Sequence, residues 1–115
     1  MATPVDLTTP STDTVQLLRQ WLQVRKSPAT IPAGGWFDAN RANADSQIVQ
    51  LTADIIAHGT AYHRKGAISV SVLKLARKLN TGNRFALTVP FEKSLETGEP
   101  EYARSLGVES GRITA

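Results

Sequence analysis

Apolar side chains recur with helical spacing in the first third of the chain. Between Asp13 and Lys26 they return every three or four positions, while glutamines and an arginine fill the opposite side. At about 100° per residue this pattern predicts an amphipathic helix. We expect Ser11 or Thr12 to cap its start. Residues 1–11, rich in threonine and proline, are expected to form a flexible N-terminal arm.

The apolar side of this first helix is wider than one packing neighbour requires. One explanation is a central helix that packs on two sides, and the other is a helix that meets a second protein chain with one of its sides. In the second case Leu17, Trp21 and Val24 would contact the partner. The residues that form the wide apolar side are Val15, Leu17, Leu18, Trp21, Leu22 and Val24.

Residues 27–43 show no hydrophobic period and contain many helix-breaking residues, which predicts a long loop. The loop carries two adjacent aromatic residues, Trp36 and Phe37, directly after a pair of glycines. These two side chains either fold back into a small core or anchor a partner protein. A third possibility is that they form a stacking surface for nucleic-acid bases.

Two further helices follow from the same 3.6-residue period. The second begins near Ala44 and ends at Gly59 or continues for a further turn. The third spans 70–80, with Ser69 or Ser71 as its cap. Its apolar stripe stands at positions i, i+3, i+4 and i+7, namely Val72, Leu75, Ala76 and Leu79.

The C-terminal part has weaker patterns. Alternation over 85–89 indicates a short strand, 91–97 a helical turn, and 100–107 a short helix. Residues 109–115 are expected to be a mobile tail. A chain of 115 residues predicts one domain. The predicted fold is therefore a mainly α, single small domain over 12–108, with three principal helices, short C-terminal helical turns and one short strand.

Composition excludes several kinds of chemistry. The chain has no cysteine, so it has no disulfide, thiolate zinc site or cysteine nucleophile. His58 and His63 with Asp54 lack the further ligands that a first-row metal needs, so no metal and no cofactor is expected. The chain contains no phosphate-binding loop, dinucleotide fingerprint or nucleophile elbow. We therefore expect neither an enzyme nor a small-molecule substrate.

Targeting signals are also absent from the sequence. The N-terminus lacks a basic start followed by an apolar run, so we expect no secretory signal. No apolar stretch approaches the roughly 18 residues of a membrane span. These observations predict a protein that is cytoplasmic or part of an intracellular assembly or virion, without membrane contact.

Charge is distributed unevenly. Residues 1–54 carry four basic and five acidic side chains, and residues 92–115 carry three basic and five acidic ones. Residues 55–91 carry six basic side chains and no acidic one. The net charge of +3 therefore conceals a strongly basic middle segment. Such asymmetry is an argument about binding partners rather than about fold.

The basic middle segment predicts contact with nucleic acid. Lys74, Arg77 and Lys78 stand at i, i+3 and i+4, so they project from the side of the 70–80 helix opposite its apolar stripe. Several adjacent cations bind polyanions because they release condensed counterions from neighbouring phosphates. We expect six residues to contact the backbone and three to stack on bases. The first group is Arg64, Lys65, Lys74, Arg77, Lys78 and Arg84, and the second is Tyr62, His63 and Phe85.

Two functions remain compatible with these patterns. The first is a small non-enzymatic accessory subunit of a nucleoprotein assembly that contacts RNA or DNA without reading sequence. The second is a protein-interaction module, such as a virion component or regulatory inhibitor, that binds through the wide apolar side of the first helix and through Trp36 and Phe37. Either function implies further protein subunits or self-association.

Overall fold

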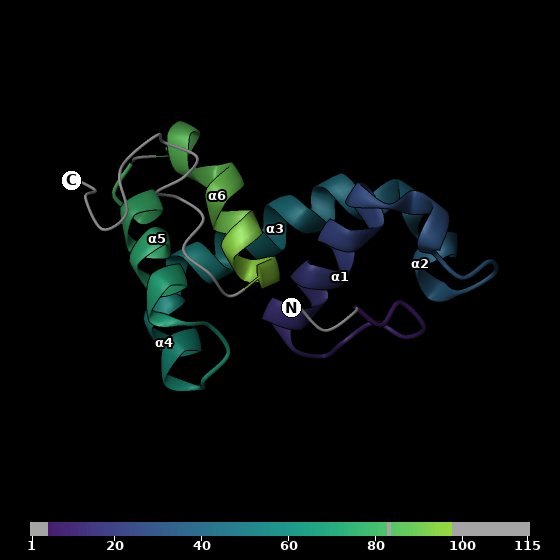
Figure 1. Ribbon diagram of the computed structural model, residues 1–115, viewed down its shortest axis with the longest axis horizontal. Coiled ribbons are helices and arrows are strands. Elements are labelled where there is room, and N and C mark those ends of the chain that lie inside the picture. The colour runs from purple at the N-terminus through teal and green to yellow at the C-terminus, as the bar shows by residue number, and fades with distance from the viewer. Residues whose placement is uncertain (1–4, 83, 98–115) are drawn as a thin grey trace. The chain divides into compact units, whose positions relative to one another are not determined.

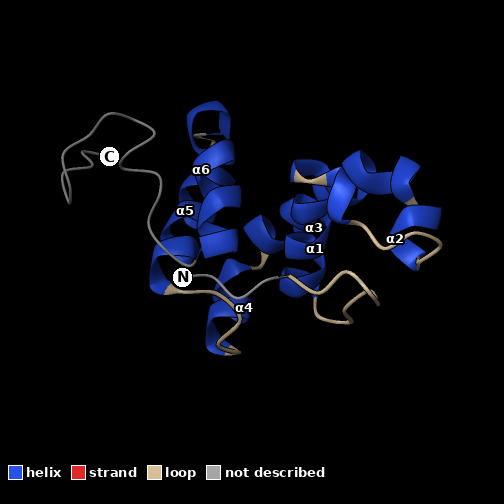
Figure 2. Ribbon diagram, turned by 45° about the vertical axis from the view of Figure 1, so that its right-hand side comes forward, coloured by secondary structure: helices blue, strands red, loops and turns tan. Residues whose placement is uncertain are grey.

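The computed structural model describes residues 5–82 and 84–97, and the elements within these ranges are helices joined by turns (Figures 1 and 2). The described residues include six α-helices and no strand, which confirms the mainly α prediction. The chain divides into two compact units, Met1–Ile55 and Ile56–Ala115, and the boundary falls in the last turn of helix α3. The single domain expected from chain length stays a prediction.

The first unit is built around α1 (Thr14–Lys26), close to the predicted bounds. The predicted caps Ser11 and Thr12 are wrong, because Asp13 is the N-cap and its Oδ2 accepts a hydrogen bond from the Gln16 backbone N–H at 2.9 Å. A carboxylate at this position suits the positive end of the helix dipole better than a hydroxyl does. Ser11 Oγ instead accepts a hydrogen bond from the backbone N–H of Asp13.

One polar residue of α1 is buried and holds the segment that precedes the helix. Gln20 Nε2 donates to the backbone carbonyls of Asp6 at 2.7 Å and Thr9 at 2.8 Å, and its Oε1 accepts from the Ser11 N–H at 2.8 Å. Leu7, in the same segment, is buried. The predicted arm therefore contacts α1 over residues 5–11, through a glutamine that the helical pattern places on its polar side.

The long loop predicted over 27–43 contains three short helices instead. They are the 3₁₀ helix η1 (Pro28–Thr30), α2 (Trp36–Ala39) and the 3₁₀ helix η2 (Arg41–Asn43). Elements of three or four residues complete no hydrophobic repeat, so periodicity cannot reveal them.

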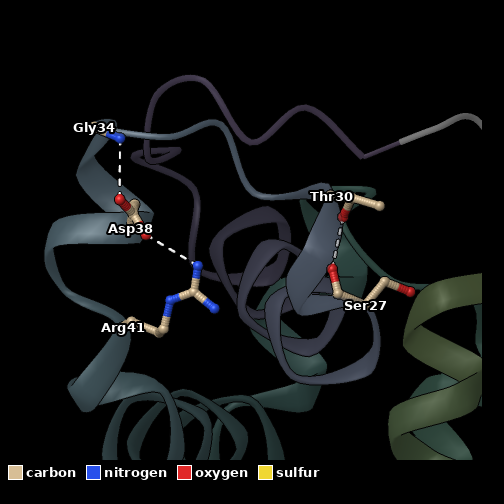
Figure 3. A network of polar contacts seen from close by, with 5 residues as sticks. All are labelled: Ser27, Thr30, Gly34, Asp38 and Arg41. Carbon is tan, nitrogen blue, oxygen red and sulfur yellow. Dashed lines mark hydrogen bonds and ion pairs between the residues drawn. The ribbon is translucent and has the colours of Figure 1, made fainter.

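Side-chain contacts close this stretch into local turns (Figure 3). The carboxylate of Asp38 accepts from the Gly34 backbone N–H at 3.0 Å and from Arg41 Nη2 at 3.0 Å. The Gly34 N–H, followed by the Arg41 guanidinium, holds the pKa of the Asp38 carboxyl below its usual value. Gly34 has a φ of 76°, which favours glycine at this position.

The aromatic residues of this stretch pack on α1. Trp21 lies 5.6 Å from Trp36 and 5.1 Å from Phe37 between ring centroids, and Trp36 and Phe37 meet edge to face at 5.0 Å. Trp21 and Phe37 are fully buried, whereas Trp36 remains 41% exposed. Of the predicted alternatives, Phe37 is therefore a core residue, while Trp36 keeps a solvent-facing surface.

The second unit consists of the end of α3 (Ala44–Ala57), α4 (Gly59–Arg64), α5 (Val70–Asn80) and α6 (Arg84–Thr97). The predicted start of α3 at 44 and the predicted bounds of α5 are confirmed. The chain does not continue as one helix past Ala57, because His58 has a non-helical backbone and acts as the N-cap of α4.

Helix α5 packs against both α4 and α6, with which it lies side by side in Figures 1 and 2. Gly59 permits the first of these contacts. A Cβ added there would lie 3.0 Å from Ala76 Cβ and 3.3 Å from Leu73 Cδ1. Such distances are shorter than ordinary van der Waals contact, so a larger residue at position 59 would require its neighbours on α5 to shift by a few tenths of an ångström.

The short strand predicted at 85–89 is wrong, since these residues lie in α6. The relevant apolar residues are Leu87, Phe91 and Leu95, which recur every four positions and are all buried. Pro90 lies inside the helix, where it removes the N–H that would bond the carbonyl of Ala86. The predicted helical turn at 91–97 is part of the same helix. The predicted elements at 100–107 and 109–115 fall outside the described residues.

The role of Gln20 leads to a prediction about stability. Gln20→Ala should lower the free energy of unfolding by about 1–3 kcal/mol, because the mutation leaves polar backbone groups of residues 6–11 without partners. Gln16→Ala, on the exposed side of the same helix, should change it by no more than about 0.5 kcal/mol. Urea unfolding measures both variants. Equal effects would mean that segment 5–11 is not held by Gln20.

The contact at Gly59 leads to a second prediction. Gly59→Ala should destabilise the protein by about 1–3 kcal/mol, although alanine favours helix, because Ala76 Cβ is bonded directly to the α5 backbone and can move away only if the backbone shifts. Combining it with Ala76→Gly should cost less than the sum of the two single changes. Thermal unfolding of the four proteins in this cycle provides the measurement. Additive effects would show that the two positions do not meet.

Candidate nucleic-acid interface

The cations of α5 lie on its exposed side. Ser69 caps the helix, its Oγ accepting from the Val72 N–H at 3.3 Å. Lys74 and Arg77 are exposed and Lys78 is half-buried. Five apolar residues of the helix are buried: Val72, Leu73, Leu75, Ala76 and Leu79. The packing of α5 thus leaves three cations directed away from the core, as their spacing predicts.

These cations have few partners of opposite charge. Within the described parts of the chain, neither Lys74, Lys78 nor Arg64 forms an ion pair with a carboxylate. Helix α6 brings Glu92 and Glu96 into the same unit, and each of these has contacts of its own. The basic side of α5 is therefore not neutralised by the carboxylates of the described residues.

Helix α4 adds a second arginine beside α5. The close approach at Gly59 brings Thr60 to α5, where Arg77 Nη2 donates to Thr60 Oγ1 at 3.4 Å. Arg64, one turn further along α4, and Arg77 both line a pocket of about 340 Å³. The other polar lining residues are His58, Thr60 and Asn80, and the apolar ones include Ile56, Ala57 and Ala61. Among the described residues, no carboxylate lines the pocket.

The predicted stacking residues are already engaged within the unit. Tyr62 and His63 are both half-buried. Lys65 Nζ lies 5.7 Å from the centroid of the Tyr62 ring, a cation–π contact. His63 Nδ1 lies 3.2 Å from the carbonyl oxygen of Ile68, and a carbonyl can only accept, so this nitrogen carries the proton of the bond. Each ring is therefore partly covered and already has a contact within its own unit.

Two predicted residues near the start of α6 cannot be placed in the interface. The backbone at Arg84 and Phe85 is helical, but the side chains of both residues lie outside the described part of the structure. Their predicted contacts with phosphate and base stay predictions.

The residues predicted to bind a protein partner lie in the first unit. Trp21, Val24 and Phe37 are buried, while Leu17 is half-buried and Trp36 is partly exposed. The wide apolar side of α1 is thus largely covered within the chain. Leu17 and Trp36 retain surface that another protein can reach.

Sequence reasoning missed the contribution of α4. Thr60 and Asn80 line the pocket beside Arg77, yet Thr60 and Arg77 are separated by 17 positions and no periodic pattern links them. The available signal is Gly59, a small residue between two helical segments, which the hydrophobic pattern identifies only as a helix end.

No group of three or more His, Cys, Asp or Glu side chains within residues 5–82 and 84–97 is placed to hold a metal ion. In the same ranges, no helix combines the length and the apolar character needed to cross a membrane.

Comparison of the chain with known protein families, with curated proteins and with solved structures gives no match. We therefore infer a function from the arrangement of the residues themselves.

Proposed function

We propose that the chain is a small non-enzymatic accessory subunit of a nucleoprotein assembly, which contacts the backbone of RNA or DNA without reading its sequence. The observation that carries the proposal is the set of exposed and half-buried cations on α5, at the end of α4 and directly after it, in a segment without a single carboxylate. The described members of the set are Arg64, Lys65, Lys74, Arg77 and Lys78.

The electrostatics of α5 support this proposal. Lys74 and Lys78 stand four positions apart on one helix, where like charges destabilise the helix by about 0.2–0.5 kcal/mol. The negative end of the helix dipole stabilises Arg77 and Lys78 in the last turn, but Lys74 lies in the preceding turn and gains less from it. A bound polyanion would supply the missing negative charge, and the release of its counterions would favour the complex.

The nature of the contacting groups favours backbone recognition over base recognition. Lysine and arginine side chains on an exposed helix supply point charges and hydrogen-bond donors to phosphate oxygens, and these contacts carry no sequence information. Tyr62 and His63 are half-buried and engaged with their own unit, so base stacking has little surface available among the described residues.

A protein-interaction module remains the second proposal, supported by the exposure of Trp36 at the edge of the aromatic cluster. A partially exposed tryptophan packed on a rigid core is a common anchor at protein interfaces. The partner would be another subunit of the assembly or a second copy of the chain. Size-exclusion chromatography with light scattering, applied to the wild-type protein and to Trp36→Ala, tests self-association.

The chain offers a matched pair of charge reversals to test nucleic-acid binding. Arg77 and Lys78 are adjacent residues in the last turn of α5, and Arg25 and Lys26 are adjacent residues in the last turn of α1. Reversing either pair to glutamate changes net charge equally and places the new charges at the same end of a helix. Only the first pair belongs to the proposed interface.

We expect Arg77→Glu/Lys78→Glu to weaken binding by about tenfold or more, because two attractions become repulsions. The magnitude of the log–log salt slope should fall by about 1.4 for a single strand, which corresponds to two lost phosphate contacts. Fluorescence anisotropy on labelled DNA and RNA of about 20 nucleotides, at several salt concentrations, measures both quantities. Circular dichroism verifies that the helices persist.

Arg25→Glu/Lys26→Glu should bind almost as well as the wild-type protein. If both double variants lose affinity equally, net charge alone explains the binding and α5 has no special role. If the wild-type protein shows no salt-sensitive binding at low ionic strength, the proposed function is wrong.

A further inference from the structure

The pocket between α4 and α5 has the composition of a site for an anionic group. Two arginines, Arg64 and Arg77, line a volume of about 340 Å³, and no carboxylate of the described residues is among its lining side chains. Arginine keeps its charge at all physiological pH values, so two arginines that share a pocket repel one another unless an anion lies between them. The described lining residues therefore supply no negative charge to offset the repulsion between the two arginines.

The hydrogen bond inside the pocket leaves a donor available for that anion. Thr60 Oγ1 accepts from Arg77 Nη2 at 3.4 Å, so the threonine hydroxyl is free to donate its own proton elsewhere. Arg77 uses one of its five N–H groups in this bond, and its remaining donors keep the planar fork that matches phosphate oxygens. Thr60 and Arg77 thus act together as neighbouring donors.

We propose that this pocket binds one phosphate group, with Arg64 and Arg77 as its charged ligands and the Thr60 hydroxyl as a further donor. A volume of about 340 Å³ is at the small end of the range of ligand pockets, which is about 300–1,000 Å³. It accommodates a phosphate with part of the attached sugar.

The source of the phosphate follows from the proposed function, on which this part of the inference rests. Lys74 and Lys78 lie on the same helix as Arg77, so a strand anchored in the pocket by one phosphate can place neighbouring phosphates near the lysines. The pocket would then fix the position of the strand. The lysines would add attraction as point charges, which do not require a particular orientation of the phosphates. A small phosphorylated molecule is the other source with the same chemistry.

The test substitutes lysine for both arginines, which preserves charge and removes the planar fork. Arg64→Lys/Arg77→Lys should lose affinity, because an ammonium group does not reproduce a bidentate contact with phosphate. Arg25→Lys/Arg41→Lys, in the first unit, is the control with the same change in chemistry and the same net charge. A surface that attracts polyanions by charge alone would not distinguish these two variants.

The first measurement uses inorganic phosphate as the probe. Amide NMR spectra are recorded during a phosphate titration at constant ionic strength, with chloride as the reference anion. We expect the amides of Gly59, Thr60 and Ala61 to shift in the wild-type protein and in the control variant. The shifts should saturate at phosphate concentrations at least about fivefold higher in Arg64→Lys/Arg77→Lys.

The second measurement uses the labelled oligonucleotide. Arg64→Lys/Arg77→Lys should bind it about tenfold more weakly than the wild-type protein, while the control variant stays within about twofold. This combination, together with the phosphate shifts, supports both the pocket and its role in holding a strand.

The remaining outcomes separate the two proposals. If the oligonucleotide binds Arg64→Lys/Arg77→Lys and the control variant as well as it binds the wild-type protein, and phosphate shifts no pocket amide, the phosphate pocket is wrong and the proposed function stands. If phosphate shifts the pocket amides in a way that depends on both arginines but the oligonucleotide does not bind, the pocket serves a free phosphorylated molecule and the proposed function is wrong. If neither ligand produces an effect, both proposals are wrong.

Discussion

The close approach of α4 to α5 at Gly59 and Ala76 is the contact on which the second unit depends. Gly59 has no side chain, and a Cβ added to it would lie only 3.0 Å from Ala76 Cβ. This proximity brings Thr60 to Arg77 and places Arg64 on the wall of the same pocket. A side chain at position 59 would require Ala76 and Leu73 to shift by a few tenths of an ångström. The packing constraint and the candidate binding site are therefore the same feature.

Helix α5 combines a packing role with an electrostatic one. Burying a leucine such as Leu75 or Leu79 stabilises the fold by about 1.5–3 kcal/mol, whereas a like-charge pair on the exposed side costs about 0.2–0.5 kcal/mol. The fold consequently tolerates three neighbouring cations on α5 without local carboxylates. Their presence is not explained by stability, which leaves binding to an anionic partner as the physical reason that we propose for them.

The long amphipathic helices were predictable from sequence, while the short and interrupted ones were not. Helices α1 and α5 each bury several residues at helical spacing, so their bounds were predicted to within about one residue. Helix α6 carries the spacing Leu87, Phe91 and Leu95, but local alternation and Pro90 favoured a strand. The helix forms because the burial of these three side chains outweighs the hydrogen bond that is lost at the proline.

The candidate site, too, was predictable only where its residues follow the repeat of one helix. The spacing of Lys74, Arg77 and Lys78 within one helix was sufficient to predict their common exposed side. The pocket requires α4 to meet α5, and that contact depends on the absence of a side chain at Gly59 rather than on any repeated pattern. Burial of Gln20 likewise depends on backbone groups 9 to 14 positions earlier in the chain.

The most direct test of the central claim is a map of the residues that nucleic acid perturbs. Amide NMR spectra recorded with an unlabelled oligonucleotide at low ionic strength report every described backbone N–H at once. The account predicts that the largest changes fall on α4 and α5, around Thr60, Arg64, Lys74, Arg77 and Lys78, and that they fade as salt is raised. Changes centred on α1 and α2, or spread evenly over the chain, would contradict it.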